Sequence, residues 1–473
     1  MKSTGEPETE QIEHLPEGDE QTLRASLAGT LVTPEDEAYD EARQVWNGMI
    51  DKFPAAIARC TGTADVVAAV EFARDHDLLP AVRGGGHNVS GNATCNGGLV
   101  IDLSEMDGVH VDRREQTVRA EGGATLGDVD RETQLHGLAT PLGVVSQTGI
   151  GGLTLSGGMG HLRREYGLAS DNLRSAEVVT ADGEVRTASE EADSDLLWAL
   201  KGGGGNFGVV TSLEYDLHPI SPDVFALFVW YHGDDGRDAL HGFREWAADA
   251  PREASVLPFT AHVPDIEEFP EAAWGEPAVV FLGCYDGSED EATETFEPLR
   301  SLAEPIADLS GAMDYTELQT MLDEDYPDGL RYYWKSVFLT DLTDAVIDQM
   351  IDHGLASPSK LSTVDVWHLG GAIADPDQDE TAFWHRDKPY LLNYEANWED
   401  PADDDENVAW VREGIETARD LAVAGGQYGN FPGFNEDPAQ ILFGDNYARL
   451  SALKALYDPD NLFRRNQNIT PNQ

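Results

Sequence analysis

Cysteine is scarce in this chain. Only three of the 473 residues are cysteines, at positions 60, 95 and 284. An odd number of widely separated cysteines gives neither a disulfide framework nor the ligand spacing of a zinc site. No group of His, Cys and carboxylate residues has metal-ligand spacing either, so we expect no bound metal. Free cysteines favour a cytoplasmic location.

Positive charge is also in short supply. Lys and Arg number 31 against 88 Asp and Glu, which gives a formal net charge of −57. This sign excludes non-specific binding to nucleic-acid phosphates. The carboxylates are spread along the whole chain and lysine occurs only at Lys2, Lys52, Lys201, Lys335, Lys360, Lys388 and Lys454. We interpret this as a surface for concentrated salt, where a Debye length of ~3 Å at 1 M screens self-repulsion, and expect a halophilic source. The alternative is an ordinary acidic protein in low salt.

Long hydrophobic runs are absent. No apolar stretch approaches the ~18 residues of a membrane span, and the polar segment Met1–Gln21 lacks the apolar core of a signal peptide. We predict that residues 1–20 form a flexible acidic tail. The length and the 41% hydrophobic content exceed what a single core usually needs, so we expect two domains.

Glycine, in contrast, is concentrated in a few segments. The first reads Arg83-Gly84-Gly85-Gly86-His87-Asn88-Val89-Ser90-Gly91. Three consecutive residues without Cβ let backbone N–H groups turn toward a bound pyrophosphate, and the His87 imidazole is a nucleophile in the place of that ligand. On this segment alone, a flavin site and a solvent loop with an uninvolved histidine are equally good interpretations.

A second glycine-dense region runs from Gly143 to Gly160. It is too rich in glycine to be regular secondary structure throughout, and close approach of backbone to a ligand explains it. A flexible linker is the alternative, which the interspersed Ile150, Leu153 and Met159 disfavour. The G-x-G-x-x-G spacing of Gly203, Gly205 and Gly208 follows a helix-like segment, Leu196–Lys201, instead of a strand, so it does not predict a Rossmann fold.

Periodicity predicts several elements. We expect helices at Ala64–His76, from Thr125 to His136 with Gly137 ending it, and at Ser288–Leu302. The strands that we expect are Leu79–Val82, Leu99–Leu103, Thr117–Glu121, Ala278–Cys284, Tyr332–Leu339, Ser362–Leu369 and Tyr390–Trp398.

Four blocks of the sequence resemble one known family. They are RGGGHNVSG at His87, Ser146–Leu173, Trp198–Tyr215 and the C-terminal Phe443–Ile469. In this order they resemble the berberine bridge enzyme family, which belongs to the vanillyl-alcohol oxidase type of FAD enzymes. The resemblance covers both ends of the chain.

The resemblance implies an α+β fold with a two-part FAD-binding domain and a substrate domain whose large antiparallel sheet is covered by helices. We place the FAD-binding domain at residues 21–222, the substrate domain at residues 223–436, and a segment that returns to the FAD domain at residues 437–473.

The resemblance also implies that FAD is bonded covalently through His87, whose neutral imidazole is a sensible nucleophile toward an electron-poor flavin. Many members have a second bond, from a cysteine; the matching position here is Val145, so we expect a single attachment. The expected cofactor-binding residues are Arg83, Gly84, Gly85, Gly86, His87, Asn88, Ser90, Gly91, Gly149, Gly152, Gly157, Gly158, Gly160, Asn172, Val210, Asn430, Asn446 and Asn468.

Candidate catalytic residues lie in two strand-like segments of the substrate domain. Asn393 and Glu395 are two residues apart and so share one face of a strand, and Tyr428 and Asn430 have the same relation. Our hypothesis is that Tyr428 is the base, that Glu395 orients it and that Asn393 binds substrate. Because a neighbouring anion raises the pKa of a phenol, Glu395 is an alternative base. Ordinary solvent-facing strand residues are the bland alternative.

The expected function is therefore FAD-dependent removal of hydride from an alcohol or hemiacetal carbon of a small molecule, with a sugar or sugar-like compound as the leading expectation. A secondary metabolite or a cyclic, nicotine-like amine is the alternative substrate, and a flavin-binding protein without catalysis is the non-enzyme alternative. The sequence leaves open whether O2 accepts the electrons and whether the protein is a monomer or a homodimer.

Overall fold

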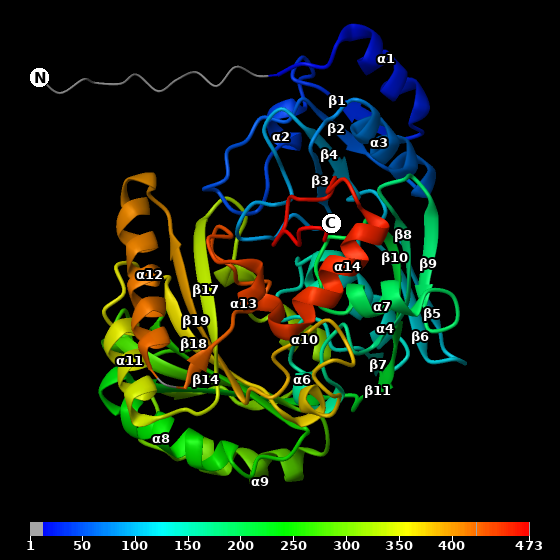
Figure 1. Cartoon of the computed structure of the whole chain (residues 1–473). Helices are drawn as coiled ribbons and strands as arrows, with labels where there is room; N and C mark the ends of the chain where they lie inside the picture. Colours follow the sequence, from blue (N-terminus) through cyan, green and yellow to red (C-terminus); the bar gives the residue numbers. More distant parts are fainter. Residues whose placement is uncertain (1–12, 422, 473) are drawn as a thin grey trace, which may run out of the picture.

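The N-terminal part of the chain contains a small sheet of four strands, at the top of Figure 1. The computed structural model describes residues 13–421 and 423–472. The sheet order is β1 (Thr30–Val32), β2 (Ala56–Arg59), β4 (Leu99–Asp102) and β3 (Pro80–Arg83), with β2, β4 and β3 parallel. Helix α3 (Thr63–Asp75) is the crossover between β2 and β3, and its Val66, Ala69 and Val70 are buried against the sheet.

A second sheet of five strands completes this part of the molecule. Its order is β5 (Val109–Asp112), β6 (Thr117–Glu121), β10 (Val209–Asp216), β8 (Leu173–Val179) and β9 (Val185–Ser189). The remaining elements of this part of the molecule are α1 (Glu17–Ser26), α2 (Tyr39–Ala42), α4 (Leu126–Gln134), β7 (Leu138–Ala139), α5 (Ile150–Leu155), α6 (Arg163–Tyr166), α7 (Ser194–Leu200) and β11 (His218–Pro219).

A nine-stranded antiparallel sheet forms the other part. Its path runs from β15 (Ala307–Asp308) through β12 (Val224–His232), β14 (Pro277–Tyr285), β13 (Ala254–His262), β18 (Thr363–His368), β19 (Tyr390–Trp398) and β17 (Arg331–Leu339) to β20 (Ala424–Gly425), and β16 (Gly311–Met313) also pairs with β12. The helices of this part are α8 (Gly236–Ala247), α9 (Glu289–Arg300), α10 (Tyr315–Thr320), α11 (Asp344–Gly354) and α12 (Asp404–Asp420).

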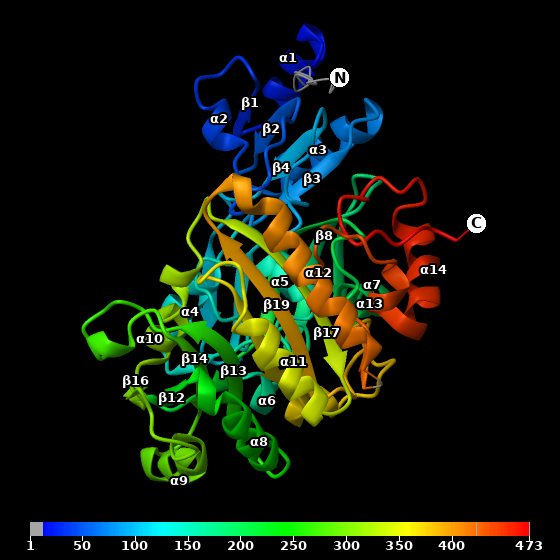
Figure 2. The ribbon, with the colours of Figure 1, turned by 90° about the vertical axis from the view of Figure 1, so that its left-hand side faces the viewer.

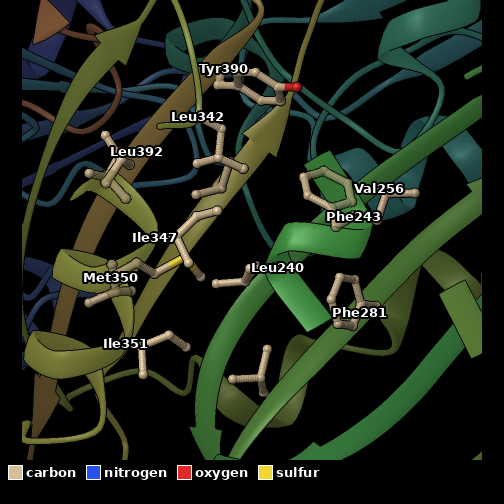
Figure 3. Packing of buried hydrophobic residues seen from close by; sticks show 14 of the residues in the cluster. Leu240, Phe243, Val256, Phe281, Leu342, Ile347, Met350, Ile351, Tyr390 and Leu392 are labelled. Carbon is tan, nitrogen blue, oxygen red and sulfur yellow. The ribbon is translucent and has the colours of Figure 1, made fainter. Parts of the chain in front are cut away.

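Helices α8, α9, α11 and α12 cover one face of the large sheet. Figure 2 shows α11 and α12 lying across β19 and β17, and Figure 3 shows Leu240 and Phe243 of α8 and Ile347 and Met350 of α11 packed toward Leu392 and its neighbours. Leu392, Tyr394 and Ala396 belong to this core. Because side chains alternate along a strand, Asn393, Glu395 and Asn397 point to the opposite face, toward the FAD-binding part.

The C-terminal segment returns to the five-stranded part. Helices α13 (Ala439–Phe443) and α14 (Tyr447–Tyr457) place Leu450 and Tyr457 in one core with Leu196 and Phe207. Within α14, buried Lys454 donates to the Asn206 and Phe463 carbonyls at 2.7 and 2.8 Å and pairs with Asp458 at 2.6 Å. These bonds fix the strand-like run that follows Phe463.

Most of the predicted elements are present. The bounds of β6 and β19 equal the predicted ranges, and the Thr125 hydroxyl caps α4 as expected. The predicted tail is corrected in part: residues 17–20 begin helix α1, whose Leu23 is buried, whereas residues 1–12 lie outside the described part of the chain. No helix among the described residues has the length and apolar character needed to cross a membrane.

Candidate active site

A cavity of about 1160 Å³ lies between the two parts of the molecule. Its wall comes from three sources: the glycine segments of the FAD-binding part, the face of the large sheet opposite α11 and α12, and the C-terminal run from Phe463 to Gln467. A site shared by all three requires the whole chain to be folded.

Glycines form one end of the cavity because backbone packs directly on backbone there. A Cβ at Gly85 would lie 2.4 Å from the Gly149 nitrogen, and a Cβ at Gly122 would lie 2.3 Å from the Val210 oxygen. Gly86 also needs a positive φ, +71°. Side chains at these positions would clash with the neighbouring backbone. Their absence leaves the backbone bare, so a ligand can approach it closely.

His87 lies in this wall with one nitrogen free. Its Nε2 atom is shielded from solvent and has no hydrogen-bond partner among the described residues. Burial lowers the pKa of His87 to about 4, so the imidazole is neutral near pH 7 and keeps a lone pair on an unprotonated nitrogen.

Trp46 sets the plane of that imidazole. Its ring is stacked on His87 at a centroid distance of 4.1 Å and on Tyr332 of β17 at 3.6 Å. The Trp46 Nε1 donates to the Tyr326 carbonyl at 2.8 Å. The imidazole therefore has a fixed aromatic neighbour that is itself held by the large sheet.

The cavity residues fit FAD. The volume exceeds the usual 300–1,000 Å³ of small-ligand pockets and suits a dinucleotide. The bare glycine backbone provides room for a diphosphate, and His87, whose Nε2 has no hydrogen-bond partner among the described residues, lines the same cavity. FAD would be held by Gly84–Asn88, Gly149–Gly152 and Val210.

Two carboxyl groups meet on the opposite wall. Glu395 of β19 and Asp365 of β18 both line the cavity, and the Asn393 amide donates to Glu395 Oε1 at 2.7 Å and to Asp365 Oδ2 at 3.2 Å. The Tyr326 hydroxyl donates to Glu395 Oε2 at 2.7 Å. Burial raises the pKa of Glu395 to about 7, and burial together with the Glu395 charge raises that of Asp365 well above its usual value. Near neutral pH the pair therefore retains a proton that two separate, exposed carboxyl groups would have lost.

Tyr428 also lines the cavity, but on a turn. The predicted strand at Gly426–Phe431 is wrong, because this segment is irregular and bends back on itself. The Tyr428 hydroxyl oxygen still accepts from Asn430 Nδ2 at 2.9 Å and from the Gly158 N–H at 3.1 Å. Burial nevertheless raises the pKa of Tyr428 to about 12.

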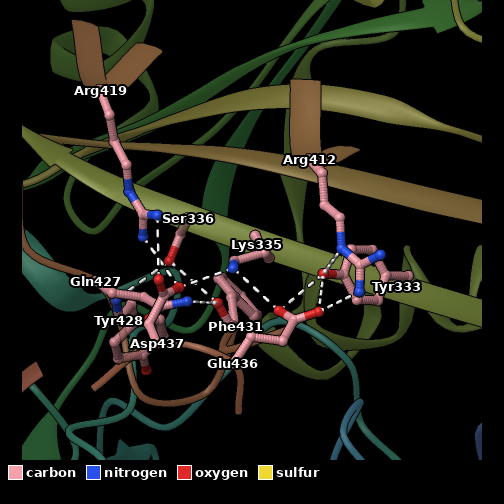
Figure 4. A network of polar contacts seen from close by, with 10 residues as sticks. All are labelled: Tyr333, Lys335, Ser336, Arg412, Arg419, Gln427, Tyr428, Phe431, Glu436 and Asp437. Carbon is pink, nitrogen blue, oxygen red and sulfur yellow. Dashed lines mark hydrogen bonds and ion pairs between the residues drawn. The ribbon is translucent and has the colours of Figure 1, made fainter. Parts of the chain in front are cut away.

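An ionic network fixes this turn to β17 (Figure 4). Lys335 pairs with Glu436 at 3.0 Å and with Asp437 at 2.7 Å, just beyond the turn. The neighbouring Ser336 hydroxyl accepts from the Tyr428 N–H at 3.2 Å. Tyr428 is thus held by the large sheet, although no regular element contains it.

The structure changes the catalytic hypothesis in two respects. Glu395 is hydrogen-bonded to Tyr326 and Asn393, and no contact with Tyr428 orients the phenol. Asn393 is fully buried beneath the two carboxyl groups and is not part of the cavity wall. It is therefore placed to bridge the carboxyl groups instead of binding substrate.

Half of the expected cofactor-binding residues line the cavity: Gly84, Gly85, Gly86, His87, Asn88, Gly149, Gly152, Val210 and Asn430. The structure places the other nine behind the wall: Arg83, Ser90, Gly91, Gly157, Gly158, Gly160, Asn172, Asn446 and Asn468.

The side chains behind the wall support backbone. Arg83 pairs with Asp102 at 2.5 Å, Asn172 donates to the Tyr166 carbonyl at 2.8 Å, and Asn446 donates to the Thr381 carbonyl at 3.0 Å. The Ser90 hydroxyl donates to Asn88 at 2.6 Å, and Gly160 packs on Gly143. A sequence motif does not separate such supporting residues from those that face the ligand.

Sequence reasoning missed four residues at the site. Asp365, Tyr326 and Arg465 line the cavity, and Trp46 stacks on His87. The motif Asp365-Val366-Trp367 lies in a predicted strand, so its alternation was available as a signal. Nothing in the sequence indicates that Trp46, 41 residues before His87, contacts it.

The fold and the cavity together define an FAD-binding oxidoreductase. The FAD binding domain family matches residues 54–189, and the berberine and berberine-like family matches residues 427–470. The chain belongs to the berberine bridge enzyme-like FAD-linked oxidoreductases, and FAD is its cofactor.

Relatives cover the chain from end to end. A FAD-linked oxidoreductase of Dictyostelium discoideum is 32% identical over 453 residues, covering 95% of this chain and 96% of the relative. The (R)-6-hydroxynicotine oxidase of Paenarthrobacter nicotinovorans is 31% identical over 468 residues, covering 94% and 97%. A solved chitooligosaccharide oxidase superposes with a TM-score of 0.83 at 25% identity, covering 96% of this chain and all of that one.

Proposed function

We propose that the protein oxidises an alcohol or hemiacetal carbon of a sugar-like molecule, with FAD attached through one bond to His87. The observation that carries this proposal is the carboxyl pair of Glu395 and Asp365, which faces a cavity whose other end is built for a flavin. Aromatic side chains, among them Trp334, Trp367 and Phe431, line the space between them. Such walls suit the C–H face of a sugar ring, and the carboxyl groups suit its hydroxyls.

The attachment rests on the chemistry of two positions. His87 offers a neutral nitrogen without a partner, as flavin attachment requires. Val145 lines the cavity at the position where relatives can carry a bonding cysteine, and a valine forms no such bond. These facts support a single attachment.

Glu395 is the proposed base. Bound FAD supplies the hydride acceptor. A base works best when its pKa is near the operating pH, and the Glu395 pKa of about 7 meets this condition, whereas that of Tyr428, about 12, does not. Protonated Asp365 donates a hydrogen bond to the substrate, and Tyr428 holds the turn that covers it. Asn393 holds the two carboxyl groups next to each other by donating a hydrogen bond to each.

A cyclic amine is the second candidate. Glu395 and Asp365 have no Lys or Arg ion-pair partner among the described residues, so an ammonium group would complete the pair. The (R)-6-hydroxynicotine oxidase relative supports this alternative. For the electron acceptor we retain both alternatives, O2 or another molecule, and for the oligomeric state both a monomer and a homodimer.

The test is anaerobic reduction of the bound flavin by a panel of aldoses, oligosaccharides and cyclic amines. The reduction is measured as the loss of the flavin's visible absorbance. Glu395→Gln should lower the reduction rate by about 10²–10⁴ with the best substrate, since it removes the base. In the unsubstituted protein the rate should rise as pH passes about 7, because Glu395 is then deprotonated, and this rise should be missing from Glu395→Gln.

Glu399→Gln is the matched control, because Glu399 is an exposed carboxylate at the mouth of the same cavity. It should reduce normally. Near-normal reduction by Glu395→Gln would remove Glu395 as the base. A flavin that no sugar and no amine reduces would contradict both substrate classes.

A further inference from the structure

Two cations meet beside the glycine end of the cavity. Lys52 Nζ donates to the Gly91 carbonyl at 3.0 Å, and Arg465 Nη2 donates to the same carbonyl at 2.9 Å and to that of Thr94 at 3.1 Å. Lys52 precedes β2 and Arg465 belongs to the C-terminal run, so the fold brings together residues from opposite ends of the chain.

In the part of the chain that the structure describes, no carboxylate forms an ion pair with either cation. Burial is the largest influence on the pKa of both groups and lowers each; the pKa of Lys52, about 8, is lowered further by the Arg465 charge. Cys95 is the one acidic group that acts on them, and its own pKa is raised to about 11, so it is a neutral thiol near pH 7. Two partly buried cations repel each other, and a bound anion between them would offset this repulsion.

The chain has 88 acidic residues for 31 Lys and Arg, yet no carboxylate of the described residues pairs with Lys52 or Arg465. Half-buried arginines elsewhere, such as Arg237 and Arg244, are paired with aspartates. The charges of Lys52 and Arg465 are instead available to a bound anion. Arg465 lines the cavity, and its Nε has no hydrogen-bond partner among the described residues.

The carbonyl that both cations share belongs to Gly91, four residues after His87. Asn88, Asn92 and Ala93 of the same loop line the cavity next to Arg465. An anion that extends from the flavin end along this loop would therefore meet Arg465, and Lys52, bound to the same carbonyl, would add its charge from behind the cavity wall. In FAD the group between flavin and adenosine is a diphosphate with two negative charges.

We propose that Lys52 and Arg465 form the cationic side of the diphosphate subsite for FAD. This rests on the proposed position of the flavin at His87. The rest of the molecule repels a dianion through its net charge of −57, and Arg465 at the cavity wall, with Lys52 beside it on the Gly91 carbonyl, offsets that repulsion where the diphosphate enters. A charged hydrogen bond to a phosphate also gives more binding energy than a neutral one.

The test measures FAD affinity in a protein that binds it reversibly. His87→Ala provides this background, since it removes the attachment, and the FAD-free form is titrated with FAD at fixed salt. Arg465→Gln and Lys52→Gln, each made in this background, should weaken FAD binding about tenfold, and Arg465→Lys should restore it. Glutamine keeps a donor for the Gly91 carbonyl, so the change is mainly one of charge.

Two controls separate a binding role from a structural one. Arg114→Gln removes an exposed cation far from the cavity and should leave FAD affinity unchanged. The melting temperature of the FAD-free protein should be the same with and without Arg465→Gln.

Unchanged FAD affinity in both glutamine variants would overturn the proposal. Loss of affinity together with loss of FAD-free stability, without rescue by Arg465→Lys, would also overturn it, because the residues then only support the loop. If the flavin is not attached at His87, acid-precipitated unsubstituted protein will be colourless, a result separate from the affinity measurement.

Discussion

His87 owes its chemical character to its neighbours. Burial holds the imidazole neutral down to about pH 4, and Trp46 holds its plane by stacking at 4.1 Å. The same tryptophan bonds to the carbonyl of Tyr326, whose hydroxyl binds Glu395. One side chain thus links the proposed flavin anchor with the proposed base.

Replacing Trp46 should therefore impair flavin attachment. In Trp46→Leu the imidazole loses its stacking partner and gains rotamer freedom, which should slow covalent attachment about three- to tenfold. Trp46→Phe keeps an aromatic face and should attach flavin at nearly the normal rate. The measurement adds FAD to FAD-free protein and follows the colour retained after acid precipitation.

His87→Ala sets the baseline, because it should retain no colour at any time. Attachment in Trp46→Leu at the rate of the unsubstituted protein would show that the stack has no positioning role.

At the scale of elements, the strands of the large sheet determine the site. The β18–β19 pairing sets Asp365 opposite Asn393, so Asp365 and Glu395 reach the same amide from neighbouring strands. Alternation within β19 predicted that Asn393 and Glu395 share a face, and this is confirmed. The partner strand and its register depend on contacts between distant residues, which local patterns do not report.

The limits of sequence reasoning follow from this difference. Capping and periodicity located α4, β6 and β19 because their causes are local. Tyr428 has strand-like spacing with Asn430, but the Lys335 network and the Ser336 hydroxyl hold it in a turn. Motifs that matched the family included both wall residues and supporting residues such as Asn172 and Asn446, whose amides bind carbonyls behind the wall.

Helix α4 carries a buried carboxyl group at its contact with α10. Both oxygens of Asp130 lack hydrogen-bond partners among the described residues, and burial raises its pKa to about 8. Below about pH 4 the group is neutral in the folded and unfolded chain alike. Between about pH 4 and 8 only the unfolded chain releases the proton, so stability falls as pH rises through this range.

Asp130→Asn should remove this loss. Its free energy of unfolding should exceed that of the unsubstituted protein by on the order of 5 kcal/mol at pH 8, about 1.4 kcal/mol for each unit of the raised pKa, and the difference should vanish near pH 4. Denaturant unfolding across this pH range measures it. A difference independent of pH would mean that Asp130 is ionised in the folded protein.

At the scale of the whole molecule, charge is the dominant property. A net charge of −57 on a folded chain is strongly self-repelling at low ionic strength, where the Debye length is ~10 Å at 0.1 M. The acidic groups line exposed faces of helices such as α9, whose Glu289, Glu294 and Glu297 are all exposed. Screening should therefore stabilise the fold.

We expect the melting temperature to rise with KCl between 0.1 and 2 M, by about 5–10 °C, as repulsion is screened. Replacing Glu289, Glu294 and Glu297 with glutamine should raise the melting temperature at 0.1 M and make it less sensitive to KCl. An equal response to KCl in both proteins would show that salt acts through something other than these charges.

The cavity wall is completed by Phe463 to Gln467, which leave the ribosome after both larger parts of the protein. During synthesis, the nascent chain therefore presents an open half-site, and FAD can be enclosed only once translation has passed this point. Cofactor loading is then a late step of the protein's synthesis.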